Sequence, residues 1–396
     1  MSKPRFVSRR RFLITAAAAA GAGLLALFQR RRATPPARAD DLIPRAYLPF
    51  VAAPDQRPRV VHVHHPQATQ WDFTSGWYGD HVDHTVVDAM LRQGLQLLTQ
   101  TASVSEAWHA LLPAYQAGQR LAIKVNLVNA ECGDSDNVID ALIEPVNALI
   151  RTLTEAGMRE EDVWVYDASR PMPSRFYGRR HYPQARFIDS DGCADARATF
   201  KLQSPSLRVF FSWPGAQVER WLTDVLQQAA YVINLPIAKR HVQAPVSLGF
   251  KNHFGSLNDL GGPLEDNPHS YIDPTTAYYN PAYQPVVDIC ANANIAGKTV
   301  LTVGDALFGA PSVHAQPIPW QTFGQQAPNS LLFSRDPVAI DCVLCDLLRA
   351  EWGVSDAAYD YLRLAETRGL GVFERGEPWG AGYQKINYVR ADLTSP

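Results

Sequence analysis

Short apolar runs alternate with helical patterns from residue 59 onward, and this alternation restricts the fold more than any other feature of the sequence. Short apolar runs indicate buried strands, whereas apolar side chains repeated every three or four positions indicate helices. The expected strands are 60–63, 121–127, 163–166, 187–189, 231–235, 299–303 and 330–333, and the expected helices are 82–98, 139–156 and 338–348. Strands that alternate with helices predict an α/β fold, in which a mostly parallel, Rossmann-like open sheet is covered by helices.

The first 39 residues have the layout of an export signal. The consecutive arginines Arg9, Arg10 and Arg11 precede an Ala-rich apolar run that ends at Phe28, and residues 37–39 fit a small-x-small cleavage site. This order is typical of a twin-arginine translocation signal. We therefore expect the twin-arginine export machinery as a partner and a periplasmic or extracellular location. An uncleaved N-terminal anchor is the alternative, because the apolar run approaches the length that spans a bilayer.

Removal of the signal changes the charge of the chain. Residues 1–39 hold nine Lys and Arg residues and no acid, so their loss takes the formal net charge from −2 to −11. An acidic protein repels nucleic acid and anionic lipid, so we expect neither a nucleic-acid partner nor membrane contact for the mature domain. A Pro- and Ala-rich linker is expected at residues 40–57, followed by a single domain at 58–396.

Cationic and amide side chains are concentrated in residues 232–255. Lys239 and His241 follow the apolar run that Pro236 ends, and Lys251 and Asn252 lie in a short helix expected over residues 245–254. Open α/β sheets bind ligands beyond the carboxyl ends of their strands. An ammonium beside an imidazole can bind a carboxylate or phosphate and transfer a proton. The alternative is that Lys251 pairs with a buried acid such as Asp305 or Asp341.

Polar residues also occur where other expected strands end. These residues are Lys124, Asn126, Asp167, Asn234, Asp305 and Asp336. Buried strands rarely carry such groups without partners, and we expect them to line one cleft with the cationic segment. Asp336 has a second interpretation, because Asp followed by Pro337 is a common helix start.

Four motifs occur in a fixed order along the chain. They are Lys124-x-Asn126, Asn234-x-Pro236-x-x-Lys239-x-His241, Lys251-Asn252-x-x-Gly255 and Asp336-Pro-Val-Ala-x-Asp341. Together they resemble the domain of unknown function family 362, an uncharacterised family, over about residues 121–348. The resemblance implies that these positions form one site, but it supplies no reaction. The family is sometimes linked to iron–sulfur proteins with ferredoxin-type cysteine runs, and this chain has no such run.

A shorter resemblance covers residues 165–173. The sequence VYDASRPMP is similar to an active-site turn of lactate-racemase-like nickel-pincer proteins, which implies that Asp167 and Arg170 bind a ligand. The His-rich segment expected of those enzymes is not evident. A surface loop turned by Pro171 and Pro173 explains the same residues without a ligand.

Metal and disulfide chemistry receive little support from the sequence. The five cysteines are odd in number and irregularly spaced, which predicts no disulfide framework, and the C-x-x-C pair Cys342 and Cys345 lies in an apolar expected helix. His62 and His64, with the acids and histidines at 80–84, offer potential ligands, but such acids more often cap a helix and such histidines are more often half exposed, so no metal is assigned. Phosphate-binding glycine loops and a serine nucleophile elbow are absent from the mature chain.

The sequence thus predicts an exported protein that binds a small anionic ligand, a carboxylate or phosphate, in a cleft lined by Lys, His and Asp. The residues expected to be catalytic are His241, Lys239 and Asp167. Those expected to bind the ligand are Lys124, Asn126, Arg170, Asn234, Lys251, Asn252, Asp305 and Asp336. An enzyme is the first hypothesis, a non-catalytic exported binding or accessory protein is the alternative, and lactate-racemase-like nickel-pincer chemistry is a minor one. Reaction, cofactor and oligomeric state are not specified.

Overall fold

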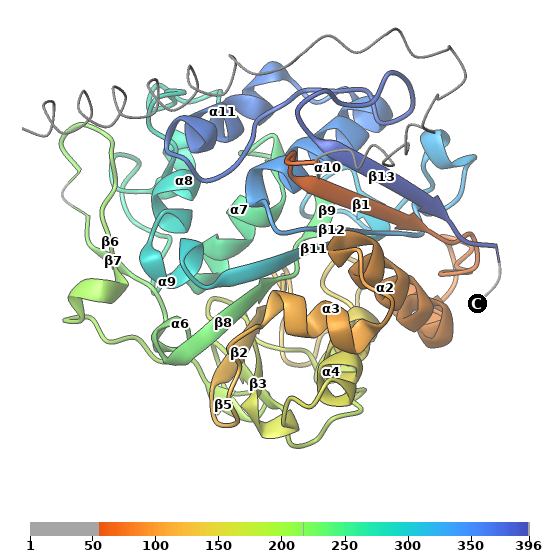
Figure 1. Cartoon of the computed structure of the whole chain (residues 1–396). Helices are drawn as coiled ribbons and strands as arrows, with labels where there is room; N and C mark the ends of the chain where they lie inside the picture. The colour runs from red at the N-terminus through yellow and green to blue at the C-terminus, as the bar shows by residue number, and fades with distance from the viewer. Residues whose placement is uncertain (1–54, 217, 395–396) are drawn as a thin grey trace, which may run out of the picture. The chain divides into compact units, whose positions relative to one another are not determined.

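The predicted α/β fold is confirmed by the computed structural model, which describes residues 55–216 and 218–394. Its main sheet has eleven strands in the order β13-β1-β12-β11-β8-β2-β3-β4-β5, with β9 paired to β11 and β10 paired to β9 (Figure 1). The strands are β1 Arg59–His64, β2 Arg120–Lys124, β3 Val163–Tyr166, β4 Arg186–Asp189, β5 Ala196–Arg197, β8 Ala229–Asn234, β9 Ile237–Arg240, β10 Val246–Ser247, β11 Thr299–Ala310, β12 Ser330–Ser334 and β13 Asn387–Asp392. Strands β6 (Arg208–Val209) and β7 (Arg220–Trp221) form a separate small sheet.

The sheet is mostly parallel, as predicted. β12 runs antiparallel to both β1 and β11, and β9 and β10 form an antiparallel hairpin. The other pairings in this sheet are parallel. The carboxyl ends of β2, β3, β8 and β11 therefore lie at one edge.

The two longest helices each begin at a capping aspartate. The helices are α2 His84–Thr99, α3 Val104–Leu111, α4 Ile143–Glu155, α5 Ser174–Tyr177, α6 Asp224–Gln228, α7 Gly249–Asn252, α8 Pro285–Cys290, α9 Ala293–Ala296, α10 Pro337–Trp352 and α11 Asp360–Thr367. The Asp83 carboxylate accepts hydrogen bonds from two amides at the start of α2, and Asp336 does the same for α10. α10 ends at Gly353, whose left-handed conformation (φ 62°) suits glycine.

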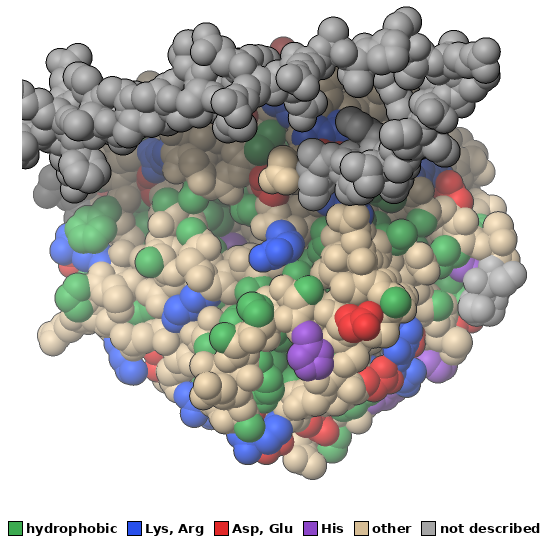
Figure 2. All heavy atoms as spheres, in the orientation of Figure 1, with side chains coloured by type: hydrophobic (Ala, Val, Ile, Leu, Met, Phe, Trp, Pro, Cys, Tyr) green, Lys and Arg blue, Asp and Glu red, His purple; other side chains and the backbone are tan. Residues whose placement is uncertain are grey.

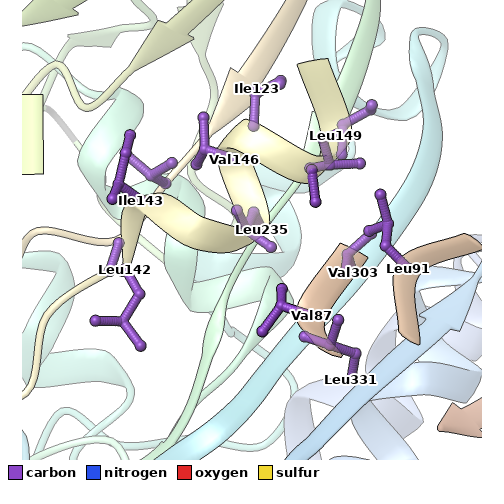
Figure 3. Close-up of a cluster of buried hydrophobic side chains, with 14 of the residues drawn as sticks. Val87, Leu91, Ile123, Leu142, Ile143, Val146, Leu149, Leu235, Val303 and Leu331 are labelled. Carbon is purple, nitrogen blue, oxygen red and sulfur yellow. The ribbon is translucent and has the colours of Figure 1, made fainter. Parts of the chain in front are cut away.

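Alternating side chains of the strands supply two cores, one on each face of the sheet. On β2, Leu121 and Ile123 pack into the core that α2, α3 and α4 cover, whereas Ala122 packs into the core that contains α10. Figure 3 shows the first core, where Val87 of α2 and Val146 of α4 lie among the strand residues. Because both faces are buried, the central strands are apolar at nearly every position. The polar residues at their ends therefore stand out.

The short helix expected over residues 245–254 is only partly present. Val246 and Ser247 pair with Arg240 and Lys239 in the β9–β10 hairpin, so helix α7 does not begin until Gly249. A 3-10 turn, His253–Ser256, follows it. Strand pairing therefore takes precedence over the helix start that Pro245 favours.

One disulfide is present, although the cysteine spacing predicted no disulfide framework. Cys132 follows β2 and Cys193 follows β4, and the fold brings their Cα atoms to 5.7 Å. Proximity of this kind depends on the topology, which the spacing does not reveal. Cys342 and Cys345 are free and buried in α10, as expected from their apolar surroundings.

The predicted export signal, residues 1–39, and most of the predicted linker lie outside the described residues. Between residues 55 and 394, apart from 217, no helix combines the length and apolarity needed to cross a bilayer.

Candidate functional site

The candidate site lies where the order of strands reverses. From β2 the chain adds β3, β4 and β5 on one side, and it then returns to place β8 on the other side of β2. Lys124, the last residue of β2, is paired in register with Asn234, the last residue of β8. Such a reversal leaves a crevice at the carboxyl ends of the strands, which is the usual ligand position in open α/β sheets.

A buried ion pair forms the floor of this crevice. The Lys124 Nζ lies 3.0 Å from Asp167 Oδ2, and the two side chains are 1% and 3% exposed. Lys124 also donates to the Val125 carbonyl oxygen, while Asp167 accepts from the Leu127 amide and from the amide and hydroxyl of Ser169. Burial lowers the pKa of Lys124, and the neighbouring carboxylate opposes this effect. Both charged groups are thus paired and hydrogen-bonded within the protein.

Asparagine side chains connect this ion pair to helix α7. Asn252 donates to the Lys124 carbonyl oxygen and to Asn234 Oδ1, and Asn234 donates to the Gly249 carbonyl oxygen. Asp341 of α10 accepts hydrogen bonds from the Gly249 and Phe250 amides at the start of α7. The motif residues therefore hold one another in place.

Gly255 allows the chain to approach this network closely. A Cβ at this position would lie 2.6 Å from Lys124 Nζ and 2.8 Å from Asp167 Oδ1, closer than a carbon atom can pack. Any larger residue therefore displaces the ion pair or the turn that follows α7.

A cavity of ≈ 60 Å³ opens above the network. Its polar lining consists of Asn126, Asp167, Ser169, Arg170, His241, Ser247, Lys251, Asn252 and His269. A groove of ≈ 550 Å³ adjoins it and shares Ser169, Arg170, Leu260 and His269 with it. The cavity is large enough for about four water molecules at roughly 15 Å³ each, and the groove offers room for a longer ligand.

Lys251 is the cation of this cavity that lacks an acidic partner among the described residues. Its Nζ lies 3.1 Å from His269 Nε2 and 4.1 Å from the centre of the Phe254 ring. Burial, with Lys239 and Arg170 nearby, lowers the pKa of Lys251 to about 7. The expected alternative, pairing with Asp305 or Asp341, is not observed, because Asp341 accepts from α7 amides and Asp305 from the Leu307 amide.

Arg170 also lacks a carboxylate partner among the residues that the structure describes. Its guanidinium donates to the carbonyl oxygens of Val128 and Ser169. The outer surface differs, since basic and acidic side chains lie interspersed on the face that Figure 2 displays. Ion pairs such as Arg92–Asp88 and Arg179–Asp80 are typical of the outer surface. The cavity thus concentrates positive charge without matching acids.

His241 lines the cavity as a neutral hydrogen-bond donor. Its Nδ1 accepts hydrogen bonds from the Gln243 and Ala244 amides, which places the ring proton on Nε2. Burial and the Lys251 ammonium lower the pKa of His241 far below its ordinary value. The ring stacks on His269 with a centroid distance of 6.1 Å, and burial lowers the pKa of His269 to about 2. No described carboxylate lies within hydrogen-bonding distance of His241.

Lys239 lies beneath the cavity and does not line it. Its Nζ donates to Asn126 Oδ1 and to the Ile139 carbonyl oxygen at 3.2 Å each. Burial lowers the pKa of Lys239 and raises that of the nearby Asp140, and each group opposes the shift of the other. Lys239 is therefore placed to orient Asn126, a residue of the cavity wall.

Two predicted residues lie apart from the cavity. Asp305 is buried in β11, where burial raises its pKa to about 7. Asp336 lies at the carboxyl end of β12, which runs antiparallel to β11 and so ends at the opposite edge of the sheet. Its carboxylate accepts from the Val338, Ala339 and Val372 amides, so it has the capping role that the sequence offered as an alternative.

His269 is the residue of the site that the sequence did not indicate. It lies in the 3-10 turn Pro268–Tyr271, next to Asn267, whose side chain caps the turn. Nothing in that segment distinguishes a ligand-facing histidine from a surface loop. In the described part of the chain, no group of three or more His, Cys, Asp or Glu side chains is arranged to hold a metal ion.

The fold and the cavity define a class of protein: an open, mostly parallel α/β sheet with a cationic cavity at the reversal of strand order. Residues 121–346 match the family described as Domain of unknown function (DUF362). This match covers more than half of the chain, which therefore belongs to that family, as its four motifs predicted. No curated protein matches the chain. A crystal structure of a protein from Thermotoga maritima is similar at 11% identity and a TM-score of 0.36, covering 72% of this chain and 59% of that one.

Proposed function

We propose that this chain is an exported enzyme that acts on a small anionic substrate, a carboxylate or phosphate, in the cavity below Arg170. One observation carries the proposal: Lys251 and Arg170 line the same cavity, and neither has a carboxylate partner among the described residues. Lys251 is partly buried and Arg170 is exposed at the mouth of the cavity, and a bound anion supplies a counter-charge to both.

The geometry suggests a role for each polar group around the anion. Arg170 and Lys251 hold it, and the Nε2–H of His241 donates a hydrogen bond to it. Lys251 acts as the general acid or base on the bound anion, because its pKa of about 7 suits proton transfer near neutral pH, and His269 orients its amine. Lys124, Asp167 and Lys239 act as positioning residues. His241, expected from the sequence to be the acid or base, becomes a neutral donor in this proposal.

Export is supported by two features that are independent of the cavity. One is the twin-arginine pattern of residues 9–11, and the other is the disulfide between Cys132 and Cys193. Structural disulfides are typical of proteins outside the reducing cytoplasm.

A non-catalytic exported binding protein is the second candidate. It is favoured by the absence of a described carboxylate near His241, because a histidine that acts as a base is commonly oriented by one. In that case, Lys251 and Arg170 bind the anion and no bond is made or broken.

The proposal is tested by thermal unfolding of the protein with acetate, pyruvate or phosphate, against chloride at the same ionic strength. Specific binding stabilises the folded state by about 2.7 kcal/mol when the anion is present at about 100 times its Kd. We expect this stabilisation to be lost in Lys251→Met and weakened in Arg170→Gln.

Lys385→Met and Asp336→Ala are the matched controls. Lys385 is an exposed lysine, and Asp336 lies at the other edge of the sheet. Both variants should respond to the anions as the unaltered protein does. Equal stabilisation in chloride and in the test anions, or a response unaffected by Lys251→Met, contradicts the proposal.

A further inference from the structure

The amine of Lys251 is more accessible to a ligand than the two other lysines near the site. Lys124 donates to Val125, Asp167 and Asn252, and Lys239 donates to Asn126 and Ile139. The Lys251 Nζ has one hydrogen-bond partner in the described structure, the imidazole nitrogen of His269, and it lines the cavity. No backbone carbonyl or carboxylate accepts its protons.

The surroundings of this amine favour its uncharged, nucleophilic form. Two cations face it, Arg170 from the turn after β3 and Lys239 from β9, and the neutral imidazoles of His241 and His269 complete that side. The one acid of the cavity wall, Asp167, is paired with Lys124. The Phe254 ring favours the ammonium form, but burial and the two cations outweigh it. A lysine withdrawn from water beside another cation is a recognised arrangement for attack on a carbonyl.

We infer that Lys251 forms an imine with a small 2-oxo acid whose carboxylate binds Arg170. The inference rests on the proposed anion site and names its substrate class. The Nζ lone pair forms a bond to the carbonyl carbon, and the carbonyl oxygen leaves as one water molecule with two protons from the amine, so a C=N bond remains and no oxidant or reductant is consumed. The His269 Nε2 accepts a hydrogen bond from the attacking amine and so orients its lone pair, the two amine protons pass to the departing oxygen, and the His241 Nε2–H donates a hydrogen bond to that oxygen.

The size and charge of the site favour this class of ligand over a larger carbonyl compound. A planar guanidinium binds a carboxylate with two parallel hydrogen bonds, which orients the adjacent carbonyl carbon. The cavity of ≈ 60 Å³ holds the carboxylate and the carbonyl group, and the groove of ≈ 550 Å³ receives the rest of the molecule. The groove also contains Arg197 and Asn258, so a polar remainder fits it.

The inference is tested by reductive trapping. The full-length protein is incubated at neutral pH with pyruvate, glyoxylate or 2-oxoglutarate and with sodium cyanoborohydride, which converts an imine into a stable secondary amine. Peptide mass spectrometry then locates the adduct. We expect modification of Lys251 at least tenfold above that of the exposed lysines Lys201 and Lys385, which serve as internal controls in the same sample.

Lys251→Arg separates this inference from the proposed anion site. Arginine keeps the positive charge, so the variant should still be stabilised by acetate and pyruvate, but it forms no adduct at residue 251. Anion-dependent stabilisation of the unaltered protein without an adduct on Lys251, or with labelling equal to that of Lys385, overturns the imine and leaves the anion site intact. The absence of both stabilisation and adduct overturns both proposals.

Discussion

Two lysines approach the same cavity, and the protein treats them in opposite ways. Lys124 is buried with a carboxylate 3.0 Å away and is further held by backbone and amide oxygens. Lys251 has an imidazole and an aromatic ring as neighbours, and two further cations lie nearby. A buried charge that the protein satisfies serves the architecture, whereas one that it leaves unsatisfied is available to a ligand. The contrast between these two lysines indicates the ligand site more clearly than the number of positive charges in residues 232–255 does.

The largest effect is expected when the satisfied lysine is removed. Lys124→Met leaves Asp167 buried without its counter-ion, which should lower the free energy of unfolding by about 3–5 kcal/mol. Lys251→Met removes no ion pair and, because burial lowers the pKa of Lys251 in the folded protein, should leave the free energy of unfolding at pH 7 unchanged or raise it. Urea denaturation monitored by circular dichroism compares the two variants. Replacing both charges, with Lys124→Met and Asp167→Asn together, should recover part of the loss, and equal losses from the two single lysine variants contradict the comparison.

A smaller loss of stability is expected when an added Cβ crowds Lys124, the satisfied lysine. In Gly255→Ala, the new Cβ lies within 3 Å of both Lys124 Nζ and Asp167 Oδ1, so the pair must shift. Overpacking of this kind typically costs about 1–3 kcal/mol. Gly133→Ala is the matched control, because no atom lies within 4 Å of a Cβ at that position. Thermal unfolding of the two variants in parallel should show a loss of stability for Gly255→Ala and none for Gly133→Ala.

The smallest effect concerns the pH dependence of the unsatisfied lysine. The pKa of Lys251 is about 7 in the folded protein and about 10.5 when unfolded, so between these values the unfolded chain binds the extra proton. The contribution of Lys251 to stability is therefore greatest above pH 10.5, and it is lost as the pH falls through 7. It amounts to at most roughly 1.4 kcal/mol per pH unit within that window. Urea denaturation at pH 7 and pH 8, between which the difference is at most about 1 kcal/mol, should show a smaller gain with rising pH in Lys251→Met than in the unaltered protein.

The sequence was sufficient for the central strands of the sheet, but not for β5, β9, β10 or β13. Apolar runs located the central strands because both faces of the sheet are buried, and polar residues at their ends stood out against that background. This reasoning predicted that Asn126 and Asp167 lie close together, and both line the cavity. It failed for Asp336, because β12 runs against its neighbours and so ends at the other edge. Strand direction is a property of pairing, which a single sequence does not state.

The roles within the site were harder to predict than its members. Lys239 and His241 alternate along one extended segment, and both were expected to face the ligand. The fold places Lys239 beneath Asn126 and leaves His241 at the wall. His269, which supplies the closest neighbour of the Lys251 amine, comes from a loop without a sequence signal. Charge pairing depends on these distances, and residue types alone do not fix them.

The disulfide has a consequence for the whole of this arrangement. Cys132 and Cys193 are 61 residues apart, and the bond between them closes α4, β3 and β4 into a covalent ring that contains both Asp167 and Arg170. Closing a loop of this length restricts the unfolded chain by about 4 kcal/mol in the entropic account of disulfide stabilisation. Material folded under reducing conditions should therefore unfold more easily, because its unfolded chain is no longer restricted by this ring. The redox conditions of production then decide how stable the protein is when its ligand binding is measured.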